Sequence, residues 1–223
     1  MSMFSQREQK RILFTKKYNT DGLSRRYFNP GELEMYLNLL DSKQPKTVIE
    51  FGVNEGRTPL AALRNIPSIE EYVGIDVLRG YETIKEVQRN EVPDNPGHFV
   101  KDDPRFKLIL AEQGSFDLIP EDLPMADVIF IDADHSRKGV CNDYALAIRR
   151  LKPNGLIIFH DDNALPVVEV TETLDEFENH RRDVDPHFIH VIGTWFCIQD
   201  WQGHELPVFE KNNLPEGSDA FPS

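Results

Sequence analysis

Short apolar runs alternate with stretches of helical periodicity along most of the chain. Five runs have the length and composition of buried strands, at residues 46–52, 71–77, 106–111, 126–134 and 155–162. Amphipathic stretches of helical period flank them, at residues 29–42, 58–66, 81–90, 139–155 and 166–180. Strands that alternate with helices predict a mostly parallel sheet with helices on both faces.

The last apolar stretch, residues 187–201, has a different pattern. It predicts two strands joined at Gly193-Thr194 without a helix between them, which makes one edge of the sheet antiparallel. The expected fold is therefore an α/β sheet of seven strands, mostly parallel, with a C-terminal antiparallel hairpin. Pro59 fits the first turn of its helix, and Pro153-Asn154-Gly155 is expected to close another.

The length of 223 residues suits one domain, which we expect at residues 31–210. Residues 1–30 are polar and could fold over a ligand as a lid, and residues 211–223 have the composition of a frayed tail. Heptads and exposed apolar stripes are not evident, so the sequence leaves open whether the protein forms a homo-oligomer.

Charge and composition exclude several classes of protein. The chain carries 38 acidic and 25 basic residues, a net charge of −13, which argues against a surface that binds nucleic acid. No apolar run approaches the roughly 20 residues needed to cross a membrane, and the N-terminus is too polar for a signal peptide. Two cysteines imply no disulfide framework, so we expect a cytoplasmic protein.

The first candidate chemistry follows the strand at residues 46–52. Gly52 and Gly56 allow a tight turn and close approach to a ligand, and the next helix begins there with unpaired N–H groups. The spacing is not the G-x-G-x-x-G of a dinucleotide site, and Glu50 and Glu55 would repel a pyrophosphate. A purely structural turn is the alternative interpretation.

Asp76 ends the second strand, 24 residues beyond Gly52. An acid at this place typically accepts hydrogen bonds from two ribose hydroxyls. The glycine turn and Asp76 together therefore predict a ligand that contains adenosine, although Asp76 could instead cap a helix.

Four acids close two further strands. Asp132 and Asp134 end the fourth strand, and Asp161 and Asp162 end the fifth. Parallel neighbours lie about 4.8 Å apart, so these carboxylates should converge at one edge of the sheet and repel one another unless a cation lies among them. Oxygen ligands suit Mg²⁺, with Mn²⁺ or Ca²⁺ as alternatives. A turn that caps the next helix is the competing interpretation.

Five blocks in this order resemble the class I S-adenosylmethionine-dependent methyltransferases. They read VIEFGVNEGRT, YVGIDV, ILAEQGSFDLIP, VIFIDADHSRKGV and LKPNGLIIFHDD, and the resemblance spans roughly residues 30 to 200. The later blocks are similar to metal-dependent small-molecule O-methyltransferases of the catechol type and to a bacterial group that contains the sequence DADH.

The resemblance implies a set of cofactor contacts. Glu50 would serve the methionine end of S-adenosylmethionine, Asp76 would hold its ribose, and Ser115 and Phe116 would contact its adenine. The full set implied for the cofactor is Glu50, Gly52, Asn54, Gly56, Thr58, Asp76, Gly114, Ser115, Phe116 and Asp132.

The resemblance also implies a metal site and a base. Asp132, Asp161 and Asp162 match the metal ligands by position, and His135 stands where the catechol enzymes have a catalytic lysine. His135 could take a proton at pH 7, with Asp134 as the rival base. His160 precedes Asp161 in the strand, so its side chain is expected on the opposite face.

The sequence therefore favours a divalent-metal-assisted O-methyltransferase that acts on a hydroxylated small molecule. Two alternatives stay open at this point: a nicotinamide-dependent oxidoreductase on a similar sheet, and a non-catalytic subunit that only binds the cofactor. The sequence does not identify the methyl acceptor.

Overall fold

A computed structural model describes residues 7–13, 16–23, 28–78, 92–164, 169–180 and 188–200 of the chain. The expected helix at 81–90, the tail at 211–223 and the start of the helix expected at 166–180 lie outside these ranges. The strands are β1 (Glu8–Lys10), β2 (Thr47–Phe51), β3 (Glu71–Val77), β4 (Phe106–Ala111), β5 (Ala126–Ile131), β6 (Leu151–Phe159), β7 (Phe188–Val191) and β8 (Cys197–Asp200). The helices are α1 (Glu32–Lys43), α2 (Arg57–Asn65), α3 (Arg137–Arg150) and α4 (Val170–His180), with single 3₁₀ turns η1 (Gly114–Asp117) and η2 (Pro120–Asp122).

The described strands form one sheet in the order β1-β7-β8-β6-β5-β2-β3-β4. Strand β8 runs antiparallel to β6 and β7, and the other pairs are parallel, as the sequence predicted. The sheet has eight strands instead of the expected seven, because Glu8–Lys10 pairs with β7. This short strand is fully polar and exposed, so the sequence carries no apolar signal for it.

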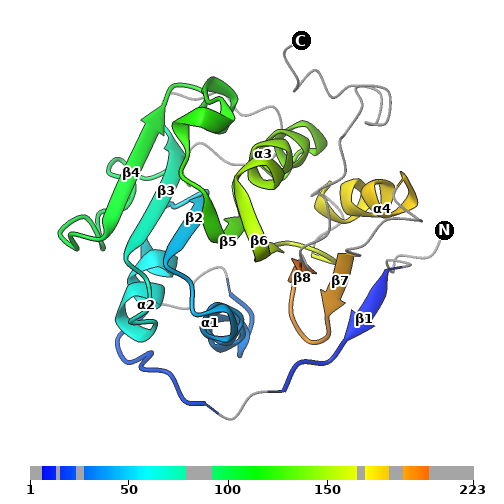
Figure 1. The fold of residues 1–223 in the computed structure, drawn as a ribbon, viewed down its shortest axis with the longest axis horizontal. Helices are drawn as coiled ribbons and strands as arrows, with labels where there is room; N and C mark the ends of the chain where they lie inside the picture. Colours follow the sequence, from blue (N-terminus) through cyan, green and yellow to red (C-terminus); the bar gives the residue numbers. More distant parts are fainter. Residues whose placement is uncertain are drawn as a thin grey trace.

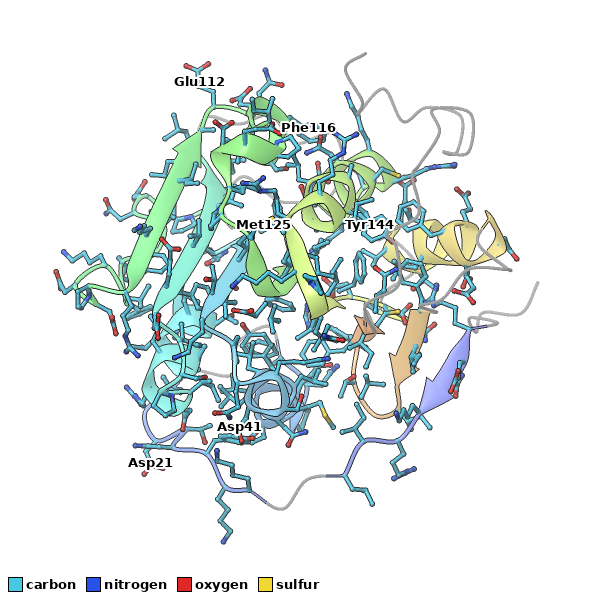
Figure 2. All side chains as sticks on the ribbon, viewed as in Figure 1. Asp21, Asp41, Glu112, Phe116, Met125 and Tyr144 are labelled. Atoms are coloured by element: carbon cyan, nitrogen blue, oxygen red, sulfur yellow. The ribbon has the colours of Figure 1, made fainter. Side chains whose placement is uncertain are left out.

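Helices cover both faces of the sheet, which confirms the predicted layers (Figure 1). Alternate residues of β2 serve opposite layers: Ile49 and Phe51 pack on the side of α3 and α4, and Val48 packs on the side of α1 and α2. Tyr144 of α3 is buried between helix and sheet, whereas Asp21 and Glu112 lie at the periphery (Figure 2).

Two expected boundaries differ from the structure. Helix α3 ends at Arg150 and β6 begins at Leu151, so the turn expected at Pro153-Asn154-Gly155 lies within the strand. The register between β5 and β6 shifts at this point, which accommodates the irregular start of β6. None of the helices in the described ranges is both long and apolar enough to span a membrane.

The strand order reverses between β2 and β5. From β2 the chain adds β3 and β4 on one side, and it then returns to add β5 and β6 on the other side. Ligands of open α/β sheets bind at the carboxyl ends of the strands near such a reversal. A ligand site is therefore expected at the carboxyl ends of β2, β3 and β5.

At this reversal the backbones of β2 and β5 come unusually close. The backbone N–H of Asp132, just after β5, donates to the carbonyl of Phe51, the last residue of β2, at 2.9 Å. Gly52 has φ 87°, and a Cβ atom placed on it would lie 2.0 Å from the carbonyl oxygen of Asp132. Only glycine fits here without moving one of the two strands.

Gly52→Ala should therefore destabilise the protein strongly. We expect a loss of at least about 3 kcal/mol in the free energy of unfolding, because backbone strain and steric overlap add. Urea unfolding measures this change in the free energy of unfolding. Gly22→Ala is the matched control, since Gly22 also has a positive φ (72°) but nothing lies within 4 Å of its Cβ position; it should cost about 1 kcal/mol. Equal losses in the two variants would contradict the close approach.

Candidate functional site

The turn after β2 contributes backbone groups to the site. Gly52, Asn54 and Gly56 all have positive φ, and Gly56 immediately precedes α2. The backbone N–H of Asn54 donates to Asp76 Oδ2 at 2.6 Å, so the glycine turn is tied directly to the end of β3. Two of the predicted cofactor elements, the turn and Asp76, therefore lie together.

Asp76 lies at the wall of a cavity with its carboxylate held in place. Its second oxygen accepts from the backbone N–H of Val77 at 2.7 Å. Burial raises the pKa of Asp76 to about 6, against the hydrogen bonds from the backbone N–H groups of Val77 and Asn54, which lower it. The carboxylate is thus ionised at neutral pH but close to its titration range.

The cavity beside Asp76 opens where the sheet order reverses. Its empty space, counted together with the part open to solvent, is about 670 Å³. Its lining comes from the ends of β2, β3 and β5, from η1 and from the segment before β4: Phe51, Gly52, Asn54, Ile75, Asp76, Val77, Val92, Pro93, Gln113, Gly114, Ser115, Phe116, Asp132, Ala133 and Asp134.

A smaller cavity, of about 390 Å³, lies next to the first one. The two share Gly52, Asn54 and Asp132, and the smaller one reaches Thr58 at the start of α2. Gly52 and Asp132 therefore border both spaces.

At the η1 end of the cavity, the residues predicted to contact adenine come together. Gly114 has φ 60°, and a Cβ on it would lie 2.6 Å from Val77 Cγ1, so the backbone of η1 lies directly against the end of β3. Phe116 is partly exposed beside the cavity, and the Lys138 ammonium lies 5.3 Å from the centre of its ring. The Ser115 hydroxyl is already hydrogen-bonded behind the cavity, to Asp143 and Asn142 of α3.

Glu50 lies deeper than the sequence suggested. It is 1% exposed and is absent from the described residues that line the two cavities. Tyr72 donates to its Oε2 at 2.9 Å, and its Oε1 has no hydrogen-bond partner among the described residues. Burial and the charges of Asp132 and Asp76 raise the pKa of Glu50 well above its usual value, although the hydrogen bond from Tyr72 opposes them.

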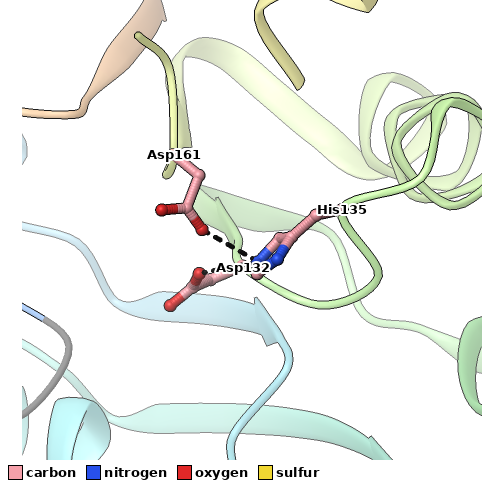
Figure 3. Close-up of side chains that lie close together, drawn as sticks. All are labelled: Asp132, His135 and Asp161. Atoms are coloured by element: carbon pink, nitrogen blue, oxygen red, sulfur yellow. Dashed lines mark ion pairs between the residues drawn. The ribbon is translucent and has the colours of Figure 1, made fainter. Parts of the chain in front are cut away.

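Beyond β5 and β6, carboxylates and imidazoles form a cluster. Ligand-type atoms of Asp132, His135 and Asp161 all lie within 4.8 Å of one another. His135 Nε2 lies 2.9 Å from Asp161 Oδ2 and 3.8 Å from Asp132 Oδ1 (Figure 3). The sequence predicted that Asp132 and Asp161 would meet, and they do.

The charges of this cluster balance one another. Burial lowers the pKa of His135, but Asp132 and Asp161 outweigh it and raise the pKa to about 10. Burial likewise tends to raise the pKa of Asp161, and His135 and His160 hold it below its usual value. Positive charge therefore does lie among the carboxylates, on imidazolium groups of the protein itself.

His160 contradicts the expectation that it would face away from the cluster. Its Nδ1 lies 3.1 Å from Asp132 Oδ1, and its Nε2 lies 3.5 Å from Glu32 Oε2 at the start of α1. Strand alternation fails here because β6 ends at Phe159 and Asp161 has φ 60°. Glu32 is fully buried, and no sequence motif pointed to it.

Asp162 is not brought into the cluster. Its side chain is fully buried, and its carboxylate pairs with Arg7 on one oxygen and with His190 Nδ1, at 2.8 Å, on the other. Burial tends to raise the pKa of Asp162, but His190 and Arg7 lower it below its usual value. Arg7 also pairs with Asp175 of α4 at 2.7 Å. The expected ligand role of Asp162 thus has no support in this arrangement.

Asp134 has a local structural partner and one free oxygen. Its Oδ1 accepts from the backbone N–H of Ser136 at 2.8 Å, just before α3. Its Oδ2 is buried and finds no hydrogen-bond partner in the part of the chain that the structure describes. Asp134 lines the larger cavity.

The sequence matches a known family over half of its length. The sequence model of a family described as "Methyltransferase domain" matches residues 49–161. An uncharacterized protein of Acanthamoeba polyphaga mimivirus is 29% identical over 120 residues, which cover 53% of this chain and 52% of that protein. The match therefore spans about half the length of that relative.

Solved structures resemble the fold at low sequence identity. A Podospora anserina methyltransferase bound to S-adenosylhomocysteine is 16% identical with a TM-score of 0.54, over 75% of this chain and 77% of that one. The MycE methyltransferase of mycinamycin biosynthesis, in complex with Mg and S-adenosylhomocysteine, is 17% identical with a TM-score of 0.51, over 87% of this chain and 58% of that one. These likenesses show the shared α/β fold.

Arg7→Met tests the buried pair beside the site. It should lower the free energy of unfolding by about 3 kcal/mol, because the Asp162 carboxylate would stay buried without its guanidinium partner. The matched change Lys46→Met, which removes an exposed pair with Glu70, should cost much less because water screens it. Urea unfolding at pH 7 compares the two, and equal losses would contradict the buried pair.

Proposed function

Because the chain belongs to the methyltransferase domain family, whose sequence model covers residues 49–161, we propose that it transfers a methyl group from S-adenosylmethionine to a hydroxyl group of a small molecule. The observation that carries the proposal is one cavity with Asp76 and Asp132 in its wall and the Gly52 backbone between the strands that bear them. S-adenosylmethionine would supply the electrophilic methyl group.

The chain's own groups match the parts of this cofactor. Asp76 presents an ionised carboxylate for the two ribose hydroxyls, and Ser115 and Phe116 lie at the η1 end, where the adenine would reach. Asn54 and Thr58 line the smaller cavity, which would take the amino acid end of the cofactor.

The acidic strand ends weigh against a nicotinamide dinucleotide. A pyrophosphate at this turn would lie close to the carboxylates of Asp76 and Asp132, which would repel it. The cationic sulfonium of S-adenosylmethionine is favoured by the same charges. The family match points in the same direction.

A divalent cation fits the cluster of Asp132, His135 and Asp161. Two carboxylates and an imidazole within 4.8 Å are a suitable donor set for Mg²⁺ or Mn²⁺. Such an ion would lower the pKa of the acceptor hydroxyl and fix its direction. Asp132 and Asp161 would hold it, and Asp162 would take part only after leaving Arg7. The MycE methyltransferase, which shares the fold, has Mg in its complex with S-adenosylhomocysteine.

His135 and Asp134 are the candidate bases. Because Asp132 and Asp161 raise the pKa of His135 to about 10, its imidazole holds a proton at pH 7 and would serve as a base only after losing that proton. Asp134 lines the larger cavity, and its buried Oδ2 has no hydrogen-bond partner among the described residues. The second candidate function is binding of the cofactor without catalysis. A protein with this function would bind S-adenosylhomocysteine but would transfer no methyl group to any of a panel of hydroxylated acceptors.

Asp76 gives the binding step a definite pH dependence. Since the pKa of Asp76 is raised to about 6, the carboxyl takes up a proton as the pH falls through 6 and can no longer accept from both ribose hydroxyls. Affinity for S-adenosylhomocysteine should therefore be constant above pH 7 and should fall by up to about tenfold per pH unit below 6. Calorimetric titrations at pH 5 to 8 measure this.

Asp76→Asn provides the control for that profile. It should bind S-adenosylhomocysteine about 10- to 100-fold more weakly at pH 8, since a hydrogen bond to a charged group is lost, and its affinity should not change between pH 5 and 8. A wild-type affinity that is independent of pH would contradict the role of Asp76.

Metal binding is tested most cleanly without a substrate. The wild-type protein should bind Mn²⁺ in an electron paramagnetic resonance titration, and Asp161→Asn should weaken this binding by at least about tenfold. Asp127→Asn is the matched control, because Asp127 lies on β5 at the end opposite Asp132 and pairs with Lys152. Equal affinity in wild type and Asp161→Asn would remove the metal from the proposal.

A further inference from the structure

The cluster of Asp132, His135 and Asp161 is assembled from two separate turns. His135 lies in the turn between β5 and α3, and Asp161 lies in the turn after β6. The two turns meet where His135 Nε2 lies 2.9 Å from Asp161 Oδ2 (Figure 3). The cluster therefore exists only while the two turns keep their places relative to each other.

The turn that carries His135 is held by Glu169, the residue just before α4. The backbone N–H of Glu169 donates to the carbonyl of His135 at 3.0 Å. Its carboxylate accepts from the backbone N–H of Arg137, the first residue of α3, at 2.9 Å. One residue thus holds this turn on both sides of Ser136.

The turn that carries Asp161 is held by Thr171, two positions further along the chain. The Thr171 hydroxyl accepts from the backbone N–H of Asn163 at 2.7 Å. Asp161 and Asn163 both have φ 60°, a conformation that residues other than glycine keep only where the surrounding structure holds it. Thr171 supplies part of that hold.

Helix α4 is itself well anchored in the fold. Val170, Leu174 and Phe177 are each at most 2% exposed, and they belong to the core on the side of α3. The Arg7 guanidinium also donates to the carbonyl of Thr171 at 3.0 Å, which ties the start of α4 to the N-terminal strand. The start of α4 is therefore a well-packed support that both turns share.

We propose that Glu169 and Thr171 are positioning residues, which set the distance between His135 and Asp161 and so prepare the cluster for a divalent cation. This rests on the proposed function, because it takes the cluster as the metal site. Neither residue belongs to the group of possible ligand atoms, so both would act through the turns they hold. Partners outside the ligand set typically change metal affinity by about 10- to 100-fold.

Two substitutions of Thr171 test the role of its hydroxyl. Thr171→Val removes the acceptor of the Asn163 N–H and keeps the shape of the side chain. In electron paramagnetic resonance titrations at pH 7, this variant should bind Mn²⁺ about tenfold more weakly than the wild type, whereas Thr171→Ser, which keeps the hydroxyl, should stay within about twofold. An equal loss in both variants would overturn the role of the hydroxyl.

Substitutions of Glu169 test the other turn, and they keep the proposal testable if Thr171→Val does not fold. Glu169→Ala removes the acceptor of the Arg137 N–H and should weaken Mn²⁺ binding about tenfold, whereas Glu169→Gln keeps an acceptor oxygen and should stay within about threefold. Glu176→Gln removes the same charge from α4 at a residue that pairs with the Arg137 guanidinium at 2.5 Å. This control should also stay within about threefold of the wild type.

The outcomes separate this inference from the proposed function. Wild-type Mn²⁺ affinity in both Thr171→Val and Glu169→Ala would overturn the inference alone. A loss in Glu176→Gln as large as that in Glu169→Ala would show an effect of charge and would overturn the positioning role of Glu169. A wild type that binds no Mn²⁺ would overturn the metal site of the proposed function together with this inference.

Discussion

The contact on which the rest of the site depends is the approach of the Gly52 backbone to the carbonyl of Asp132. Strands β2 and β5 are neighbours at the reversal of strand order, and their ends stay hydrogen-bonded through Asp132 and Phe51. Without a side chain at Gly52, the ends of β2, β3 and β5 surround one cavity instead of being separated by a Cβ atom. The tie between the turn and Asp76 then sets one wall of that cavity, and Asp132 sets another.

The second constraint is electrostatic. The chain buries several carboxylates near the strand ends, and some of them are paired with basic side chains. Asp162 is paired with Arg7 and His190, and Asp132 and Asp161 lie against His135 and His160. A divalent ion and the imidazolium protons would therefore compete for the same carboxylates. This competition links the proposed metal to the proposed base.

The sequence predicted the parts of this arrangement that repeat along the chain. Apolar periodicity indicated the layers and the antiparallel hairpin, and the residues after each strand indicated Asp76, Asp132 and Asp161, because parallel strands bring their carboxyl ends together. Contacts that depend on tertiary structure had no such signal. Arg7 lies in a polar segment, 155 positions before the carboxylate with which it pairs. The position of His160 depends on a positive φ at Asp161, and no pattern of residues in the sequence predicts that φ.

A crystal structure of the protein with S-adenosylhomocysteine would show directly whether the cofactor binds between these strand ends. We expect the ribose hydroxyls within hydrogen-bonding distance of the Asp76 carboxylate, the adenine beside Ser115 and Phe116, and the sulfur facing Asp132 across the Gly52 turn. A ligand bound elsewhere on the molecule, or bound in this cavity with its ribose away from Asp76, would contradict this expectation.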